Sequence, residues 1–124
     1  LEGLVDLRGK TTVEEMVAWM GRMDLFLGMD SFAVHLSNLL EVPALVLLST
    51  TAASSFQWHR HVSCLTSGIQ CAPCFALRDE CPQGHGICEA FQHHSITPEC
   101  IVNSVVRKME QVFLRKLTWR NEKK

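Results

Sequence analysis

The stretch that decides the fold spans residues 24–50 and reads DLFLGMDSFAVHLSNLLEVPALVLLST. Two apolar runs of strand length, 24–30 and 44–49, lie at its ends, as expected of parallel strands covered on both faces. The segment 31–41 between them has the spacing of a short helix and is closed by Pro43. This strand–helix–strand order predicts a parallel sheet with a right-handed crossover.

A further strand and helix are predicted upstream. The run LVDLRG at 4–9 is short, contains Val and Leu and is closed by glycine, which is typical of a strand. The helix after it has a capping box at its start, formed by Thr11 with Glu14 or by Thr12 with Glu15. The beginning of the chain therefore follows a β-α-β-α-β order, which favours the α/β class.

The 124 residues are expected to form a single domain of three parts. The core lies at 1–50, a loop region rich in Cys and His at 51–96, and a helix at 97–118 that opens with Thr97 and Pro98. We expect this helix to bury a broad apolar face. Its members are Ile101, Val102, Val105, Val106, Met109, Val112 and Phe113.

Composition and charge exclude several classes of protein. The net charge is −1, from 12 basic and 13 acidic residues, and no basic cluster of the kind that binds nucleic acid is present. The basic residues near the C-terminus are mixed with Glu110 and Glu122 and are typical of a solvated helix face. The sequence has no run of eighteen apolar residues and no apolar signal-peptide core, so a cytoplasmic protein without a transmembrane helix is expected.

The candidate ligand site lies where the strand 24–30 meets the next helix. Asp30, Ser31 and Phe32 follow the strand directly, and His35 comes one helical turn later. In parallel sheets ligands bind at the carboxyl ends of strands, where amide groups of a helix N-terminus attract anions. Lys10 is a further candidate phosphate ligand. The alternatives are an N-cap worth about 1 kcal/mol at Asp30 or Ser31, a His35 bonded to a backbone carbonyl, and a solvated Lys10.

The cysteines raise a second hypothesis. Cys71, Cys74, Cys81 and Cys88 have the spacing C-x2-C-x6-C-x6-C, and four thiolates can hold Zn or Fe in a structural tetrahedral site. His85 could replace one of the last two thiolates. Thiols that pack a loop, or disulfides formed on oxidation, are the alternatives. The other histidines of the loop region are expected to be surface residues because no acidic partner stands at ligand spacing. They are His59, His61, His93 and His94.

A series of short motifs in one order resembles a known family. They are Gly9-Lys10-Thr11-Thr12, Asp24-Leu25, Asp30-Ser31 with His35, Val42-Pro43, Cys71-Ala72-Pro73-Cys74, Cys81-Pro82, His85, Cys88 and Ile96-Thr97-Pro98-Glu99. This series resembles the C-terminal half of the family 9 glycosyltransferases, which include the ADP-heptose:lipopolysaccharide heptosyltransferases. The resemblance covers nearly the whole chain.

The resemblance implies a Rossmann-like, partial C-terminal domain of a two-domain GT-B glycosyltransferase. Such a domain binds a nucleotide-sugar, here expected to be ADP-heptose, needs no other cofactor, and places the corner of Asp30, Ser31, Phe32 and His35 against the donor's diphosphate. The acceptor, a lipopolysaccharide core or related glycan, binds the N-terminal domain. That domain also supplies the general base, so this chain alone holds no catalytic residue and is expected to be inactive.

The same resemblance implies a cellular location and binding partners. A lipid-linked acceptor puts the enzyme in the cytoplasm at the inner face of the cytoplasmic membrane, as a peripheral protein without a nucleic-acid partner. The sheet edge left without its neighbouring strands could pair with a second copy of the chain.

Two departures from the family pattern bear on the donor site. Phe32 stands where the family has a glycine, and Ser49-Thr50-Thr51 replaces a Phe-Gly-Pro-Thr turn. Glycine lets a phosphate approach the backbone closely, and a phenyl ring could block that approach. These departures favour one alternative function, a non-catalytic interaction module. The cysteine motif favours another, a domain stapled by metal at its cysteines.

Overall fold

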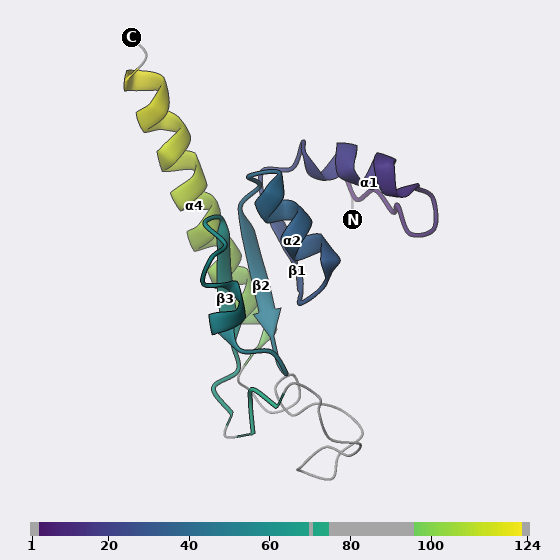
Figure 1. Cartoon of the computed structure of the whole chain (residues 1–124). Coiled ribbons are helices and arrows are strands. Elements are labelled where there is room, and N and C mark those ends of the chain that lie inside the picture. The colour runs from purple at the N-terminus through teal and green to yellow at the C-terminus, as the bar shows by residue number, and fades with distance from the viewer. Residues whose placement is uncertain (1–2, 70, 75–95, 123–124) are drawn as a thin grey trace.

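The computed structural model describes residues 3–69, 71–74 and 96–122, and forms a small α/β unit (Figure 1). Three strands, β1 (Phe26–Met29), β2 (Ala44–Leu48) and β3 (Val62–Thr66), pair in parallel in the order β1-β2-β3. The register joins Phe26 to Ala44 and Ala44 to Val62. The predicted α/β class and parallel sheet are therefore confirmed.

Helices lie on both sides of this sheet. Helix α1 (Val13–Met20) precedes β1, and α2 (Phe32–Leu39) joins β1 to β2. The short helix η1 (Ala53–Phe56) leads to β3, and the long helix α4 (Pro98–Glu122) follows the loop region. Figure 1 shows α2 and α4 on opposite sides of the sheet. Among the described helices, none combines the length and apolar character that a membrane span requires.

The front face of the sheet, which we define as the face toward α2 and η1, holds the core. Val34 of α2 and Phe56 of η1 pack there on Ala44, Val46 and Leu48 of β2, and all five side chains are buried. On β1 the ring of Phe26 lies over Gly28, where a Cβ would come within 2.6 Å of a ring carbon. A larger residue at position 28 would displace this ring.

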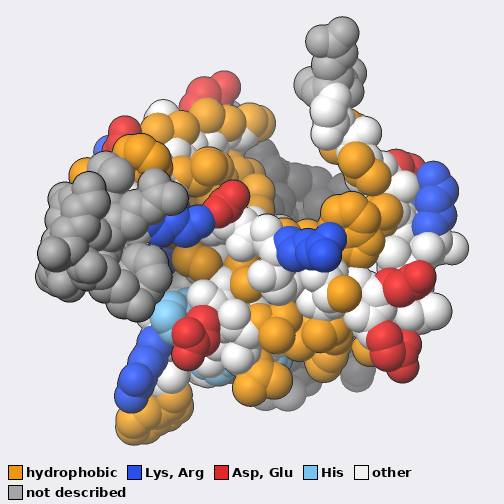
Figure 2. Space-filling view, turned by 90° about the horizontal axis from the view of Figure 1, so that it is seen from above, with side chains coloured by type: hydrophobic (Ala, Val, Ile, Leu, Met, Phe, Trp, Pro, Cys, Tyr) orange, Lys and Arg blue, Asp and Glu red, His pale blue; other side chains and the backbone are white. Residues whose placement is uncertain are grey.

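The back face, toward α4, is covered only in part. Leu45 of β2 is buried, whereas Leu27 and Met29 of β1 are 44% and 51% exposed. The α4 stripe of Val102, Val106, Met109 and Phe113 is also exposed, which corrects the prediction that it is buried. α4 contacts the sheet through its neighbouring stripe, and a helix can press only one stripe against one surface. Much of the surface seen in Figure 2 is hydrophobic.

The predicted capping box of α1 is present. The Thr12 hydroxyl accepts from the Glu15 amide at 3.2 Å, and the Glu15 carboxylate accepts from the Thr12 amide at 2.8 Å. Gly21 caps the other end of the helix. The local sequence alone fixes both ends of α1, because each cap lies within the helix or next to it.

Two predictions for the chain order are wrong. The segment 4–9 forms no strand. It turns instead, with the Lys10 amide bonded to the Leu7 carbonyl at 3.1 Å. A strand requires a neighbour that accepts its hydrogen bonds, and no described segment pairs with 4–9. In addition, the predicted loop region at 51–96 contains β3 and η1. β3 was missed because its five residues carry little periodicity and are defined by pairing with β2.

Candidate functional site

The candidate ligand site lies at the carboxyl ends of β1 and β2. Asp30 directly follows β1 and Ser31 is the N-cap residue of α2, so both stand where the chain turns from strand to helix. Asp30 and Ser31 are exposed, and Phe32 is 62% exposed. The phenyl ring is therefore not packed into the protein interior at this corner. We call Asp30, Ser31, Phe32 and His35 the Asp30 corner.

The helix N-terminus at this corner is open. The Ser31 side chain makes no cap hydrogen bond, and the first turn of α2 contains no acidic residue. The Val34 amide donates to the Ser31 carbonyl at 3.1 Å. Within the described residues, no side chain caps the amides of Phe32 and Ala33, which leaves them for a ligand at the positive end of the helix dipole.

The Asp30 carboxylate is held by a residue that follows β2, the neighbouring strand. The Thr51 hydroxyl donates to its Oδ2 at 2.5 Å. Thr51 comes soon after β2, and because parallel strands end at the same edge, the two residues meet there. Burial and the negative charge of Asp30 raise the pKa of the Cys64 thiol on β3. The corner therefore holds a carboxylate that is fixed by a hydrogen bond between the segments following β1 and β2.

His35 is positioned by two aromatic partners. Its ring is stacked on Phe56, with ring centroids 5.8 Å apart, and its Nδ1 lies 3.0 Å from Nε2 of His59. The His59 ring meets Phe56 edge-on at 5.4 Å. One nitrogen of the 3.0 Å contact donates its hydrogen and the other accepts it with a lone pair.

His59 is a site residue that the sequence did not predict. The expectation of a surface histidine is wrong, because the ring is half-buried and its Nδ1 is buried without a hydrogen-bond partner among the described residues. Only η1 brings His59 back beside α2, and no spacing rule connects positions 35 and 59. Thr51 could have been anticipated, since it follows a parallel strand next to the one that Asp30 follows.

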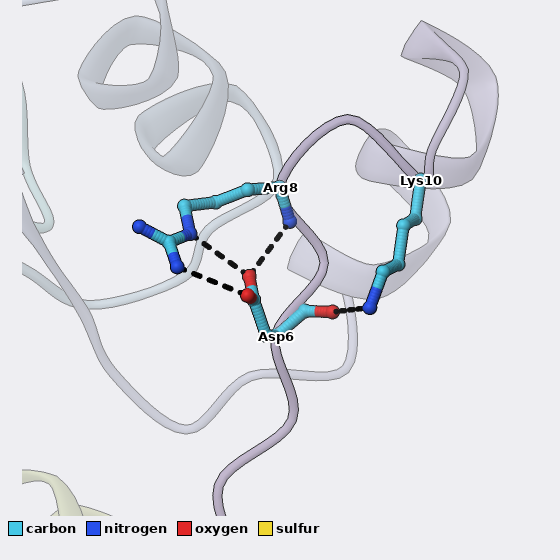
Figure 3. A network of polar contacts seen from close by, with 3 residues as sticks. All are labelled: Asp6, Arg8 and Lys10. Atoms are coloured by element: carbon cyan, nitrogen blue, oxygen red, sulfur yellow. Dashed lines mark hydrogen bonds and ion pairs between the residues drawn. The ribbon is translucent and has the colours of Figure 1, made fainter.

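Lys10 is not brought to the Asp30 corner. Its Nζ donates to the Asp6 carbonyl at 3.1 Å, in a loop where Arg8 binds the Asp6 carboxylate through two nitrogens at 3.0 Å (Figure 3). The Arg8 guanidinium lowers the pKa of the Asp6 carboxyl. No described contact joins Lys10 to Asp30, Ser31 or His35. Its role as a phosphate ligand stays a prediction.

The cysteine motif is described only in its first half. Cys71 and Cys74 are half-buried free thiols, whereas Cys81, His85 and Cys88 lie outside the described residues. Over residues 3–69, 71–74 and 96–122, no three His, Cys, Asp or Glu side chains are grouped to hold a metal ion. The four-thiolate site for Zn or Fe therefore stays a prediction.

The parallel sheet and its helices define an α/β protein of the Rossmann-like type. The sequence matches the model of Glycosyltransferase family 9 (heptosyltransferase) over residues 2–85. Since this match covers more than half of the chain, the chain belongs to that family, and its membership implies a nucleotide-sugar donor and an acceptor. Comparisons with curated proteins and with solved structures found no match.

Proposed function

We propose that the chain is the donor-binding part of a glycosyltransferase that transfers a sugar from a nucleotide-sugar to a glycan. The observation that carries the proposal is the uncapped, exposed N-terminus of α2, which directly follows Asp30 and precedes His35 by one helical turn. A leaving nucleoside diphosphate gains negative charge as the glycosidic bond breaks. Free amides and a histidine N–H stabilise this charge without a metal ion.

Each residue of the corner has a part in this function. The amides of Phe32 and Ala33 bind the diphosphate, and the Ser31 hydroxyl adds one hydrogen bond. His35 donates from Nε2, which forms no hydrogen bond with the described residues, while His59 and Phe56 hold the ring in place. Asp30, held by Thr51, accepts hydrogen bonds from hydroxyl groups of the donor.

The identities of the donor and the acceptor are proposed from the family to which the chain belongs. We propose ADP-heptose as the donor and a lipopolysaccharide core or related glycan as the acceptor, in an enzyme of GT-B architecture at the inner face of the cytoplasmic membrane. The acceptor site and general base belong to the other domain of that architecture. The chain is therefore proposed to bind the donor and not to turn it over alone.

Isothermal titration with ADP-heptose tests the site. We expect His35→Ala to weaken binding at least about tenfold, since a hydrogen bond to a charged group is worth about 1.5–3 kcal/mol. The matched control is Leu39→Ala, because Leu39 is exposed at the other end of the same helix. Equal losses in the two variants, or a loss in Leu39→Ala alone, would contradict the proposed site.

The alternative function is a non-catalytic interaction module, and the exposed ring of Phe32 at the corner favours it. The variant Phe32→Gly distinguishes the donor-binding function from the interaction module. If the corner binds donors, this variant binds ADP-heptose at least as tightly as the wild type. If neither the wild type nor Phe32→Gly binds the nucleotide-sugar, the interaction module is the better conclusion.

A further inference from the structure

A pocket lies at the opposite end of the sheet from the Asp30 corner. It has a volume of about 330 Å³. Gly21, Met23 and Asp24 before β1 and the segment 40–43 before β2 form one side, with His61 just before β3. The α4 segment 108–116 forms the other side. Figure 2 looks onto this end of the molecule and shows acidic, basic and histidine side chains close together at its left.

The basic residues of this pocket outnumber their acidic partners. Lys108, Arg115 and Lys116 line it from α4, together with His61. Asp24 is already engaged, because it accepts a hydrogen bond from Lys116. Within the part of the chain that the structure describes, no carboxylate forms an ion pair with Lys108 or Arg115. The remaining acidic residue of the lining is Glu41, which is exposed.

Lys108 is the residue that most needs a counter-ion. It is half-buried, and its Nζ donates to the neutral hydroxyl of Ser63 at 2.6 Å. Burial and the positive charge of Arg115 together lower the pKa of the Lys108 ammonium. A cation in this situation gains stability from an anion bound between it and its neighbour, because an opposite charge offsets both burial and repulsion.

We propose that this pocket binds a small phosphate-bearing anion through Lys108 and Arg115, with His61 as a further donor. Arg presents a planar fork to phosphate oxygens and Lys a point charge, a combination suited to a phosphate group. The pocket volume is at the small end of the range for ligand pockets. Inorganic phosphate or a sugar phosphate fits this chemistry better than a larger nucleotide. The pocket is separate from the donor site because the two lie at opposite ends of the strands.

Titrating the whole chain with phosphate tests the proposal. Binding is measured by amide chemical shifts and by the midpoint of thermal unfolding. Chloride at matched ionic strength controls for screening. We expect saturable shifts at His61 and along 108–116, and a midpoint that rises with phosphate concentration. Ribose 5-phosphate in place of inorganic phosphate distinguishes a sugar phosphate from the free ion by its lower dissociation constant.

Three variants sharpen the test. Lys108→Gln and Arg115→Gln should each weaken phosphate binding at least about tenfold, since each removes a charge-assisted hydrogen bond. Arg107→Gln is the matched control, because Arg107 is exposed on α4 and does not line the pocket. Arg115 is exposed, so its variant remains informative if the half-buried Lys108 is needed for folding. Phosphate shifts that do not saturate, or an equal loss in Arg107→Gln, would overturn the proposal.

Discussion

The two faces of the sheet differ in how completely they are covered. On the front face, α2 and η1 bury the side chains of β2 in a closed core. On the back face, α4 covers β2 but leaves Leu27 and Met29 of β1 exposed. Parallel sheets usually have both faces covered by helices. The difference indicates that the front face stabilises the chain, while the β1 part of the back face adds little.

The largest expected effect compares two leucines, one on each face. Leu48 is 1% exposed at the end of β2, and its truncation leaves a cavity in the front core. We expect Leu48→Ala to lower the free energy of unfolding by about 3 kcal/mol. Leu27→Ala on β1 should cost less than about 1 kcal/mol, because its side chain is already partly in water. Urea unfolding measures both. Equal losses would mean that the back face is as well packed as the front.

An effect of intermediate size is expected on solubility when exposed apolar residues of β1 and α4 are replaced. Exposed apolar patches promote association between molecules, so Leu27→Lys with Val106→Lys should raise the solubility limit about threefold or more while the fold is kept. Precipitation by polyethylene glycol measures this limit, and circular dichroism checks the fold. The control Val13→Lys changes another exposed valine, which lies on α1. A similar gain in that control would show that added charge, and not the back face, is responsible.

The smallest expected effect concerns Cys64 on the front face. Burial and the charge of Asp30 raise its pKa above the usual value of 9.0, so the thiolate is disfavoured in the folded chain. Stability from this group is complete below the unfolded pKa and is lost as the pH rises through the folded pKa.

Peptide-resolved alkylation at pH 8 tests this prediction. Asp30→Asn removes the second cause of the pKa shift and should speed the modification of Cys64 about twofold. The modification of Cys100, which lies on α4 on the other side of the sheet, should not change. An unchanged rate at Cys64 would show that burial alone raises its pKa.

Part of the candidate site could be predicted from the sequence and part could not. Asp30 and Ser31 were placed correctly because a polar residue after an apolar strand reaches the edge of a parallel sheet. His59 could not be placed, since its contact with His35 depends on the path of η1. The basic pocket also escaped prediction, because Lys108 meets His61 only through the packing of α4 against the sheet.

The sequence by itself determined the local elements of this protein. The capping box of Thr12 and Glu15, the apolar strands β1 and β2, and the helix that starts at Pro98 all follow from residues close together in the chain. Only the tertiary structure decided that 4–9 is not a strand, that β3 is one, and which stripe of α4 is buried. The physical reason is that strand pairing and burial are properties of contacts between distant segments, and a local pattern does not specify the partner.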